Sequence, residues 1–171
     1  MPSTLQRIME EVRNKLQEMQ FTPEPGDGCA GISRDSIVIW KTGIGMKDGE
    51  ESLPQVNLPG LVITPPKSVR APSMMGTNKR DDVIYPVLIQ LVDNDGTERY
   101  NNLPSYLRWL EQIRRTMHAR SWPEVELKAY GDVYASFAET TDTVDLKTWK
   151  RFPGLFVVGV AVLFTVRETR E

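Results

Sequence analysis

The chain contains segments with a regular hydrophobic period, separated by segments with none. Near the N-terminus, apolar residues recur at steps of three and four with charged residues between them: Leu5, Ile8, Val12, Leu16 and Met19. This spacing predicts an amphipathic helix from about Thr4 to Gln20, with one stripe packed on a sheet. Ser3 and Gln6 are spaced as a capping box at its start, and the sequence Pro-Glu-Pro-Gly that follows ends the pattern.

A second helix is predicted by the segment "PSYLRWLEQIRRTMHARSWP", which runs from Pro104 to Pro123. Pro104 suits the first turn, where a missing N–H needs no partner, and Pro123 prevents continuation. The periodicity places six residues on one side of this helix: Tyr106, Leu107, Leu110, Ile113, Arg114 and Met117.

Runs of β-branched and aromatic residues predict the first strands of the sheet. "SIVIWK" (Ser36–Lys41) reads as one strand and "LVIT" (Leu61–Thr64) as a brief second one. A longer strand is predicted over Val83–Val92, where both alternating faces are largely apolar. Pro86 donates no ladder hydrogen bond, so it is expected at an edge, a bulge or the beginning of this strand.

The last two predicted strands are expected to pair as an antiparallel hairpin. Apolar and polar residues alternate over Val125–Phe137, and the most apolar run of the chain, Leu155–Val166, follows a long polar tip at Glu139–Gly154. The final strand has one bulky and one slim apolar face, which places it in the middle of a sheet covered on both sides. Two helices supply one layer at most, so the second layer is expected from the chain's own irregular arm or from a neighbouring subunit.

That arm is the segment from about Gly43 to Arg80, which is rich in Gly, Pro and charge and poor in core-forming residues. Segments of this length with so little structure are usually disordered or ordered by a partner. The order of elements predicts a single α+β domain over residues 1–171, with a small, mostly antiparallel sheet flanked by two helices and an extended arm at about residues 43–80.

Composition narrows the functional classes. A chain of 171 residues buries roughly 70% of the surface that its unfolded form exposes. Lys and Arg number 21 against 23 for Asp and Glu, so the net charge of −2 gives no general bias toward nucleic acid or anionic membranes. The single Cys29 cannot form an internal disulfide, which fits a reducing cytosol and an unreactive loop thiol. No signal-peptide pattern begins the chain, and Leu155–Val166 is short of the ~20 residues that a spanning helix needs.

Catalytic and nucleotide-binding motifs are not apparent. The single His118 falls in the last turn of the second predicted helix among arginines, where a basic residue complements the helix dipole, and one His with one Cys does not furnish a zinc site. The sequence has neither G-x-x-x-x-G-K-[ST] nor G-x-G-x-x-G. No catalytic or cofactor-binding residue is therefore predicted.

Acidic residues bracket the strand over Val83–Val92. Asp81 and Asp82 precede it and Asp93 and Asp95 follow it, but at ~3.3 Å per residue the two ends lie roughly 35 Å apart and do not share one ion. The spacing around Gly96 also fails as a calcium loop, so the Asp-Asn-Asp-Gly sequence reads as a strand-ending turn. No metal ligand is predicted.

Methionines in the irregular arm suit adaptable contacts, and a protein that buries its arm on identical neighbours would combine them with strands apolar on both faces. Ring or filament assembly is therefore the hypothesis from the residues alone. The residues predicted to contact a partner or another subunit are Trp40, Met46, Met74, Met75, Arg80, Asp81, Asp82, Trp149 and Phe152.

Four segments together resemble the tail-terminator and neck (head–tail joining) proteins of long-tailed bacteriophages: "LPGLVITPP", "GTNKRDDVIYPVLIQLVDND", "YLRWLEQIRRTMH" and "VLFTVRETRE". The resemblance implies a small sheet flanked by helices that assembles as a homo-oligomeric ring, usually of six subunits. Such a ring sits on the last ring of the tail tube, stops its polymerisation and presents a surface to the head's connector. It also implies a location in the virion tail or neck, with assembly in the host cytoplasm, DNA only as passing cargo, and no membrane, cofactor or enzymatic activity.

Other readings stay open at this point. A head-closure or other neck-ring protein would share the same plan, and the length of "GIGMKDGEESLPQVNLPG" leaves open which partner is contacted where. A small metal-dependent enzyme would use Asp81, Asp82, Asp93 or Asp95. A nucleic-acid-binding adaptor would show steeply salt-dependent DNA affinity.

Overall fold

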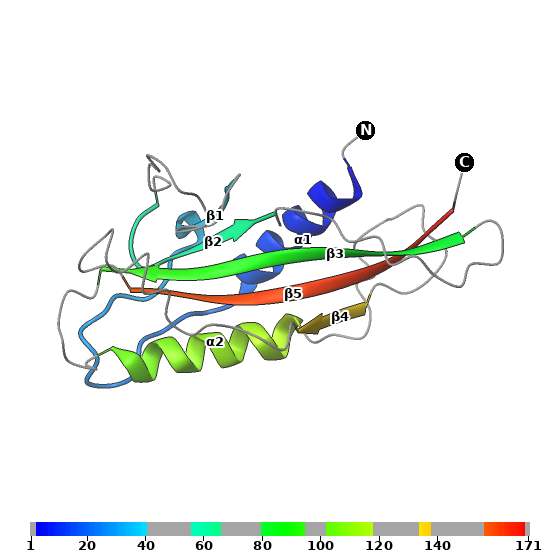
Figure 1. Cartoon of the computed structure of the whole chain (residues 1–171). Coiled ribbons are helices and arrows are strands. Elements are labelled where there is room, and N and C mark those ends of the chain that lie inside the picture. Colours follow the sequence, from blue (N-terminus) through cyan, green and yellow to red (C-terminus); the bar gives the residue numbers. More distant parts are fainter. Residues whose placement is uncertain are drawn as a thin grey trace.

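Five strands and two α-helices make up the part of the chain that the computed structural model describes, which is residues 3–40, 56–65, 80–94, 102–117, 134–137 and 156–169. The strands form one sheet in the order β1-β2-β3-β5-β4, and the fold is α+β, as predicted (Figure 1). In chain order the elements are α1 (Thr4–Glu18), the 3-10 turn η1 (Arg34–Ser36), β1 (Ile37–Ile39), β2 (Gly60–Thr64), β3 (Arg80–Asp93), α2 (Leu103–Met117), β4 (Tyr134–Phe137) and β5 (Phe156–Thr169).

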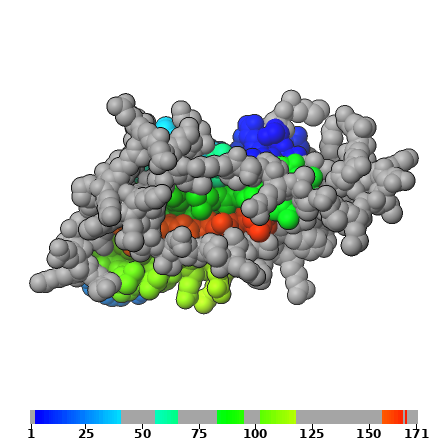
Figure 2. All heavy atoms as spheres, viewed as in Figure 1, coloured from blue at the N-terminus to red at the C-terminus, as the bar shows by residue number. Residues whose placement is uncertain are grey.

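The sheet is mostly antiparallel. Only β1 and β2 run parallel, while β2–β3, β3–β5 and β4–β5 are antiparallel pairs. β3 and β5 are the longest strands and stay in register from Arg80 opposite Thr169 to Asp93 opposite Phe156. In Figure 2 they run side by side across the visible surface.

β2 pairs with only part of β3. The pairing ends with Thr64 opposite Leu88, so within the described residues β3 is bonded on one side only from Arg80 to Val87. Pro86 lies in this stretch. Proline has no N–H to donate, and it is tolerated here because β2 does not pair with this part of β3. Of the three positions expected for Pro86, which were an edge, a bulge or the beginning of the strand, the described part of the chain shows an edge.

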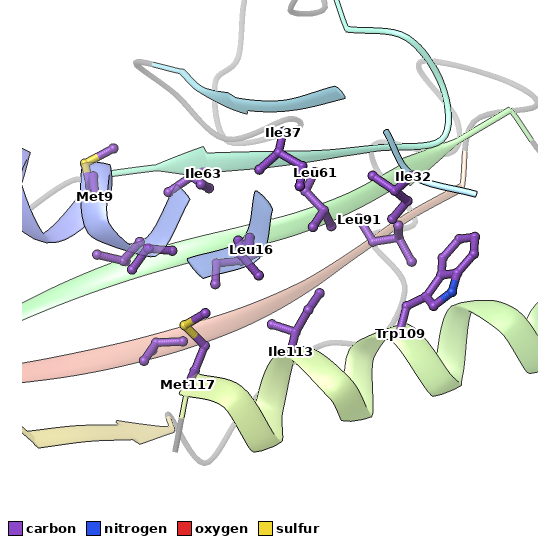
Figure 3. Close-up of a cluster of buried hydrophobic side chains, with 14 of the residues drawn as sticks. Met9, Leu16, Ile32, Ile37, Leu61, Ile63, Leu91, Trp109, Ile113 and Met117 are labelled. Atoms are coloured by element: carbon purple, nitrogen blue, oxygen red, sulfur yellow. The ribbon is translucent and has the colours of Figure 1, made fainter. Parts of the chain in front are cut away.

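One face of the sheet packs against both helices. Buried side chains of α1 and α2 share a single cluster with the inward residues of β1, β2, β3 and β5 (Figure 3). The bulky face of β5 lies in this cluster through Val158, Val162, Phe164 and Val166, all of them buried. The two helices therefore form one layer, and the opposite face of the sheet has neither of them over it.

The sequence predicted the start of α1 better than its end. Ser3 is the N-cap and accepts a hydrogen bond from the Gln6 N–H at 3.2 Å. The Gln6 side-chain NH2 group donates to Glu10 Oε1 at 2.9 Å. The helix ends at Glu18 rather than at Gln20, because the chain turns there into an extended stretch that pairs through Phe21 with Ile32.

The predicted inward face of α2 was partly wrong. Leu107 is 52% exposed, whereas Trp109, which the prediction left out, is completely buried. Trp109 is drawn inward because its indole N–H donates to the Thr22 carbonyl at 2.9 Å and its ring meets Phe21 edge to face, with centroids 6.4 Å apart. Both residues suit a helical period, so only these partners from a distant loop decide between them.

The strands differ from the predictions mainly in length. Ser36 belongs to η1, so β1 is shorter than the predicted Ser36–Lys41. β2 lies inside the range assigned to the irregular arm, yet all five of its residues are buried between β1 and β3, so this part of the arm belongs to the core. Residues 43–55 and 66–79 of the arm, His118 and most of the strand predicted over Val125–Phe137 lie outside the described residues. β4 covers the end of that predicted strand and pairs antiparallel with β5, as expected.

Neither described helix has the length and apolarity required to cross a membrane.

A glycine is required at the start of β2. A Cβ on Gly60 would lie 2.7 Å from Val56 Cγ2 and 2.9 Å from the Ser36 carbonyl oxygen. Gly60→Ala is expected to lower the free energy of unfolding in urea by about 1–3 kcal/mol, as overpacking does. Gly28→Ala is the control, because its Cβ would meet only Asn102 Oδ1 at an ordinary 3.8 Å. Equal costs for the two variants would contradict the close packing at Gly60.

The orientation of α2 is testable with a pair of substitutions one half-turn apart. Trp109→Ala is expected to cost about 3–5 kcal/mol of unfolding free energy, because it empties a large buried site. Leu107→Ala is expected to change it by no more than about 0.5 kcal/mol, because that side chain already faces solvent. Denaturant titrations followed by far-ultraviolet circular dichroism measure both, and a larger cost for Leu107→Ala would overturn this orientation.

Candidate functional site

The candidate site is the face of the sheet opposite the helices, which we call the second face. Strand side chains alternate between faces, and the register places the same set of positions together on this side. The second face consists of Val38, Val62, Thr64, Ile84, Pro86, Leu88, Gln90, Val92, Val157, Gly159, Ala161 and Leu163. From Ile84 to Val92 and at the paired positions of β5 the second face carries no charge, which is typical of an interior surface. Beyond Ile84 the same alternation continues the face to charged positions, with Asp82 opposite Arg167.

Burial varies along the second face. At the β1–β2 end, Val62, Val92 and Val157 form a small buried cluster. Toward the other end of β3 and β5, Ile84 and Leu163 are only half-buried. The second face is therefore mainly apolar, and its cover is less complete toward Ile84 and Leu163.

Small residues of β5 make room on the second face. A Cβ on Gly159 would lie 3.2 Å from Leu88 Cδ1, so the Leu88 side chain extends over this glycine. Ala161 is the next residue of β5 on the same face and stands opposite Leu88 in the register. The slim face predicted for the last strand is thus the second face, as its alternation implied.

One polar group on the second face is unpaired. Thr64 is completely buried, and its Oγ1 has no hydrogen-bond partner in the part of the chain that the structure describes. Burial of a hydroxyl without a hydrogen bond costs about 1–3 kcal/mol. Thr64 therefore weakens this end of β2 relative to an apolar residue of the same shape.

Trp40 is the predicted contact residue that the structure places on the second face. Its backbone N–H donates to the Ile63 carbonyl at 2.8 Å, and its half-buried side chain packs on the cluster of Val62, Val92 and Val157. Sequence reasoning selected Trp40 but missed the valines beneath it. Their signal was present in the alternation of the strands, which separates the two faces.

Arg80, Asp81 and Asp82 are the first residues of β3 and stand opposite Thr169, Glu168 and Arg167 of β5. Arg80 is eight residues from Leu88 along β3, which is roughly 26 Å in an extended strand. The Trp40 N–H donates to the Ile63 carbonyl, and Ile63 is next to Thr64, which pairs with Leu88. The structure therefore does not bring Trp40 and these charged residues together. The other predicted contact residues, which are Met46, Met74, Met75, Trp149 and Phe152, lie outside the described residues.

The acids considered as metal ligands are separated by the strand. Asp82 and Asp93 fall at opposite ends of the continuous β3, as the spacing predicted. Asp93 is buried and its carboxylate accepts a hydrogen bond from the Tyr106 hydroxyl at 2.6 Å, a contact that the sequence analysis missed. Among the described residues no group of three or more His, Cys, Asp or Glu side chains is placed to hold a metal ion. Asp95 lies outside them.

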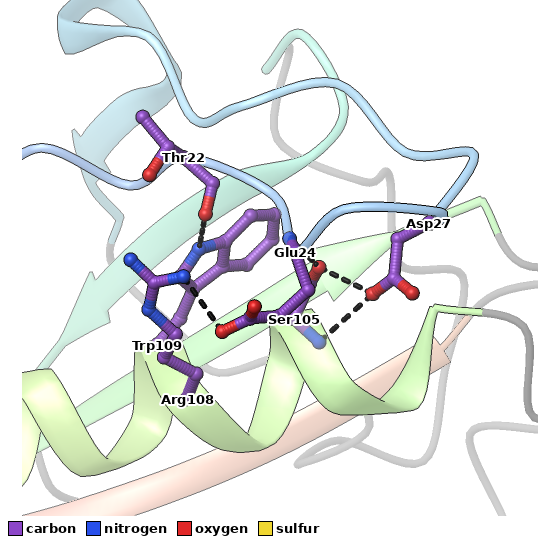
Figure 4. A network of polar contacts seen from close by, with 6 residues as sticks. All are labelled: Thr22, Glu24, Asp27, Ser105, Arg108 and Trp109. Carbon is purple, nitrogen blue, oxygen red and sulfur yellow. Dashed lines mark hydrogen bonds and ion pairs between the residues drawn. The ribbon is translucent and has the colours of Figure 1, made fainter.

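The other polar cluster of the molecule joins the loop of residues 21–31 to the first turns of α2 (Figure 4). Asp27 accepts hydrogen bonds from both the backbone N–H and the hydroxyl of Ser105, and the Ser105 hydroxyl accepts from the Glu24 N–H at 2.8 Å. Arg108 pairs with Glu24 at 2.6 Å. These groups pair with one another and cap the N-terminus of α2, so the cluster has a structural role in holding the loop against the helix.

Cys29 lies at the edge of this cluster. Burial raises the pKa of its thiol, and the negative charges of Asp93 and Asp27 raise that pKa further, while a hydrogen bond with Ser105 lowers it. The thiol is therefore protonated at neutral pH, and a protonated thiol is a poor nucleophile and a poor metal ligand. This agrees with the interpretation of Cys29 as an unreactive loop thiol.

Comparison of the chain with models of known protein families gives no match, and comparison with curated proteins gives none either. The resemblance to tail-terminator and neck proteins therefore stays a prediction from the sequence.

The unpaired hydroxyl on the second face gives a stability prediction. Thr64→Val replaces the buried hydroxyl by a methyl group of similar size, so thermal or urea unfolding is expected to show a gain of about 1 kcal/mol. Thr22→Val is the control, because the Thr22 side chain is exposed, and it is expected to change stability by no more than about 0.5 kcal/mol. A loss of stability in Thr64→Val would mean that the hydroxyl has a partner.

The raised pKa of Cys29 gives a prediction about pH. Because Cys29 is the single cysteine, alkylation by iodoacetamide reports on it alone. The native protein is expected to react more slowly than the urea-unfolded protein between pH 7 and 9, with its rate rising at higher pH than that of the unfolded chain. The unfolded thiol also loses its proton first, so this group makes stability fall as pH rises through the unfolded pKa. Faster alkylation of the native protein would contradict the burial.

Proposed function

We propose that this protein is a non-enzymatic assembly subunit that forms a ring of identical copies at the head–tail junction of a long-tailed bacteriophage, as a tail terminator does. The ring, of six copies by the resemblance, caps the tail tube and joins it to the head's connector. The observation that carries the proposal is the second face, which lies opposite both helices and, from Ile84 to Val92 and across the paired part of β5, is mainly apolar and carries no charge.

The two faces of the sheet differ in how completely they are covered. A sheet with two apolar faces is stable when both are removed from water, and each Å² of apolar surface left exposed forfeits about 25 cal/mol. α1 and α2 occupy one face. On the other, Ile84, Leu88 and Leu163 remain half-buried, and a contiguous apolar patch of this kind is typical of an interaction surface. A second copy of the chain is the occupant that the resemblance implies.

Two surfaces of the sheet could contact another copy, namely the free edge of β3 and the second face. Among the described residues, β3 has a hydrogen-bonded neighbour on one side only from Arg80 to Val87, and such an edge can template pairing with another strand. Here the stretch contains Pro86 and begins with Arg80, Asp81 and Asp82, and proline and charge are the features that discourage edge-to-edge pairing. The contact between copies is therefore assigned to the second face, with the charged end of β3 left for polar contacts.

The polar side chains near the start of α2 are engaged in structural contacts. Glu24, Asp27 and Ser105 are engaged in fastening α2, Asp93 holds Tyr106, and the raised pKa of Cys29 keeps its thiol protonated. This supports a role that is steric and adhesive rather than catalytic. The partners are then further copies of the chain, the tail tube protein and the head-closure or connector protein, with DNA passing through the lumen without specific affinity. The protein would reside in the tail or neck of the virion after assembly in the host cytoplasm.

Association through the second face is testable by light scattering coupled to gel filtration and by negative-stain imaging. The unmodified protein is expected to show a mass near six chains of 19.4 kDa and ring-shaped particles. Ile84→Glu is expected to reduce the measured mass to that of one chain, because the variant buries an unpaired carboxylate at every contact between copies. Leu107→Glu is the matched control: it places the same charge on the exposed side of α2 and is expected to leave the ring intact.

Circular dichroism distinguishes loss of assembly from loss of fold in both variants. A well-folded monomer for the unmodified protein at high concentration would overturn the proposal. Ring loss in Leu107→Glu but not in Ile84→Glu would assign the contact to the helical face instead. Heat released on titration with Ca²⁺, Mg²⁺ or Mn²⁺ would favour the metal-dependent enzyme.

A further inference from the structure

We draw no further inference here: the strongest candidate, the half-buried Cys29 thiol beside Asp27, Asp93 and Ser105 at the start of α2, is a lone cysteine at the edge of the hydrogen-bonded network that fastens α2, and no second observation among the described residues points to a ligand there.

Discussion

The pairing of β3 with β5 is the constraint on which the rest of the structure depends. The two strands stay in one register over their whole length, from Arg80 opposite Thr169 to Asp93 opposite Phe156. Side chains alternate with a period of two, so a slip by one residue would move the bulky residues of β5 away from the helices. With this register, Phe164 and Val162 face the helical layer and Gly159 and Ala161 face the other side.

The helices complete the interior by two different means. α1 lays a stripe of aliphatic side chains on β1 and β2, and its position needs little beyond amphipathic packing. α2 is held in addition by polar contacts with the loop of residues 21–31, through Asp27 and Ser105 and through the Trp109 indole. These directional bonds set the rotation of α2 about its own axis. Apolar packing alone would not decide whether the side with Leu107 or the side with Trp109 faces inward.

The distribution of polar groups bears on function. Where the chain gathers hydrogen-bonding side chains, at the start of α2, they are consumed in holding the loop and the helix together. On the face of the sheet away from the helices, most positions from Ile84 to Val92 and on the paired part of β5 are apolar, and none of them is charged. The first arrangement serves folding, and the second is what association between subunits requires. The proposed ring subunit uses both.

The sequence by itself determined the elements that depend on local pattern. The period of three and four placed α1 and its Ser3 cap, and the period of two separated the bulky and slim faces of β5 and identified β3 as apolar on both sides. Trp40, which sequence reasoning selected as a contact residue, packs on the cluster of Val62, Val92 and Val157. Pro86 at an open edge followed from its missing N–H.

Only the tertiary structure decided the features that depend on partners distant in the sequence. Trp109 rather than Leu107 faces inward because Thr22 and Phe21 meet it there, and Asp93 holds Tyr106 because β3 ends beside α2. The sequence predicted β2 as a brief strand, but its place in the interior of the sheet depends on pairing with β1 on one side and β3 on the other. Local periodicity carries no information about such neighbours, since they are brought together only when the chain folds.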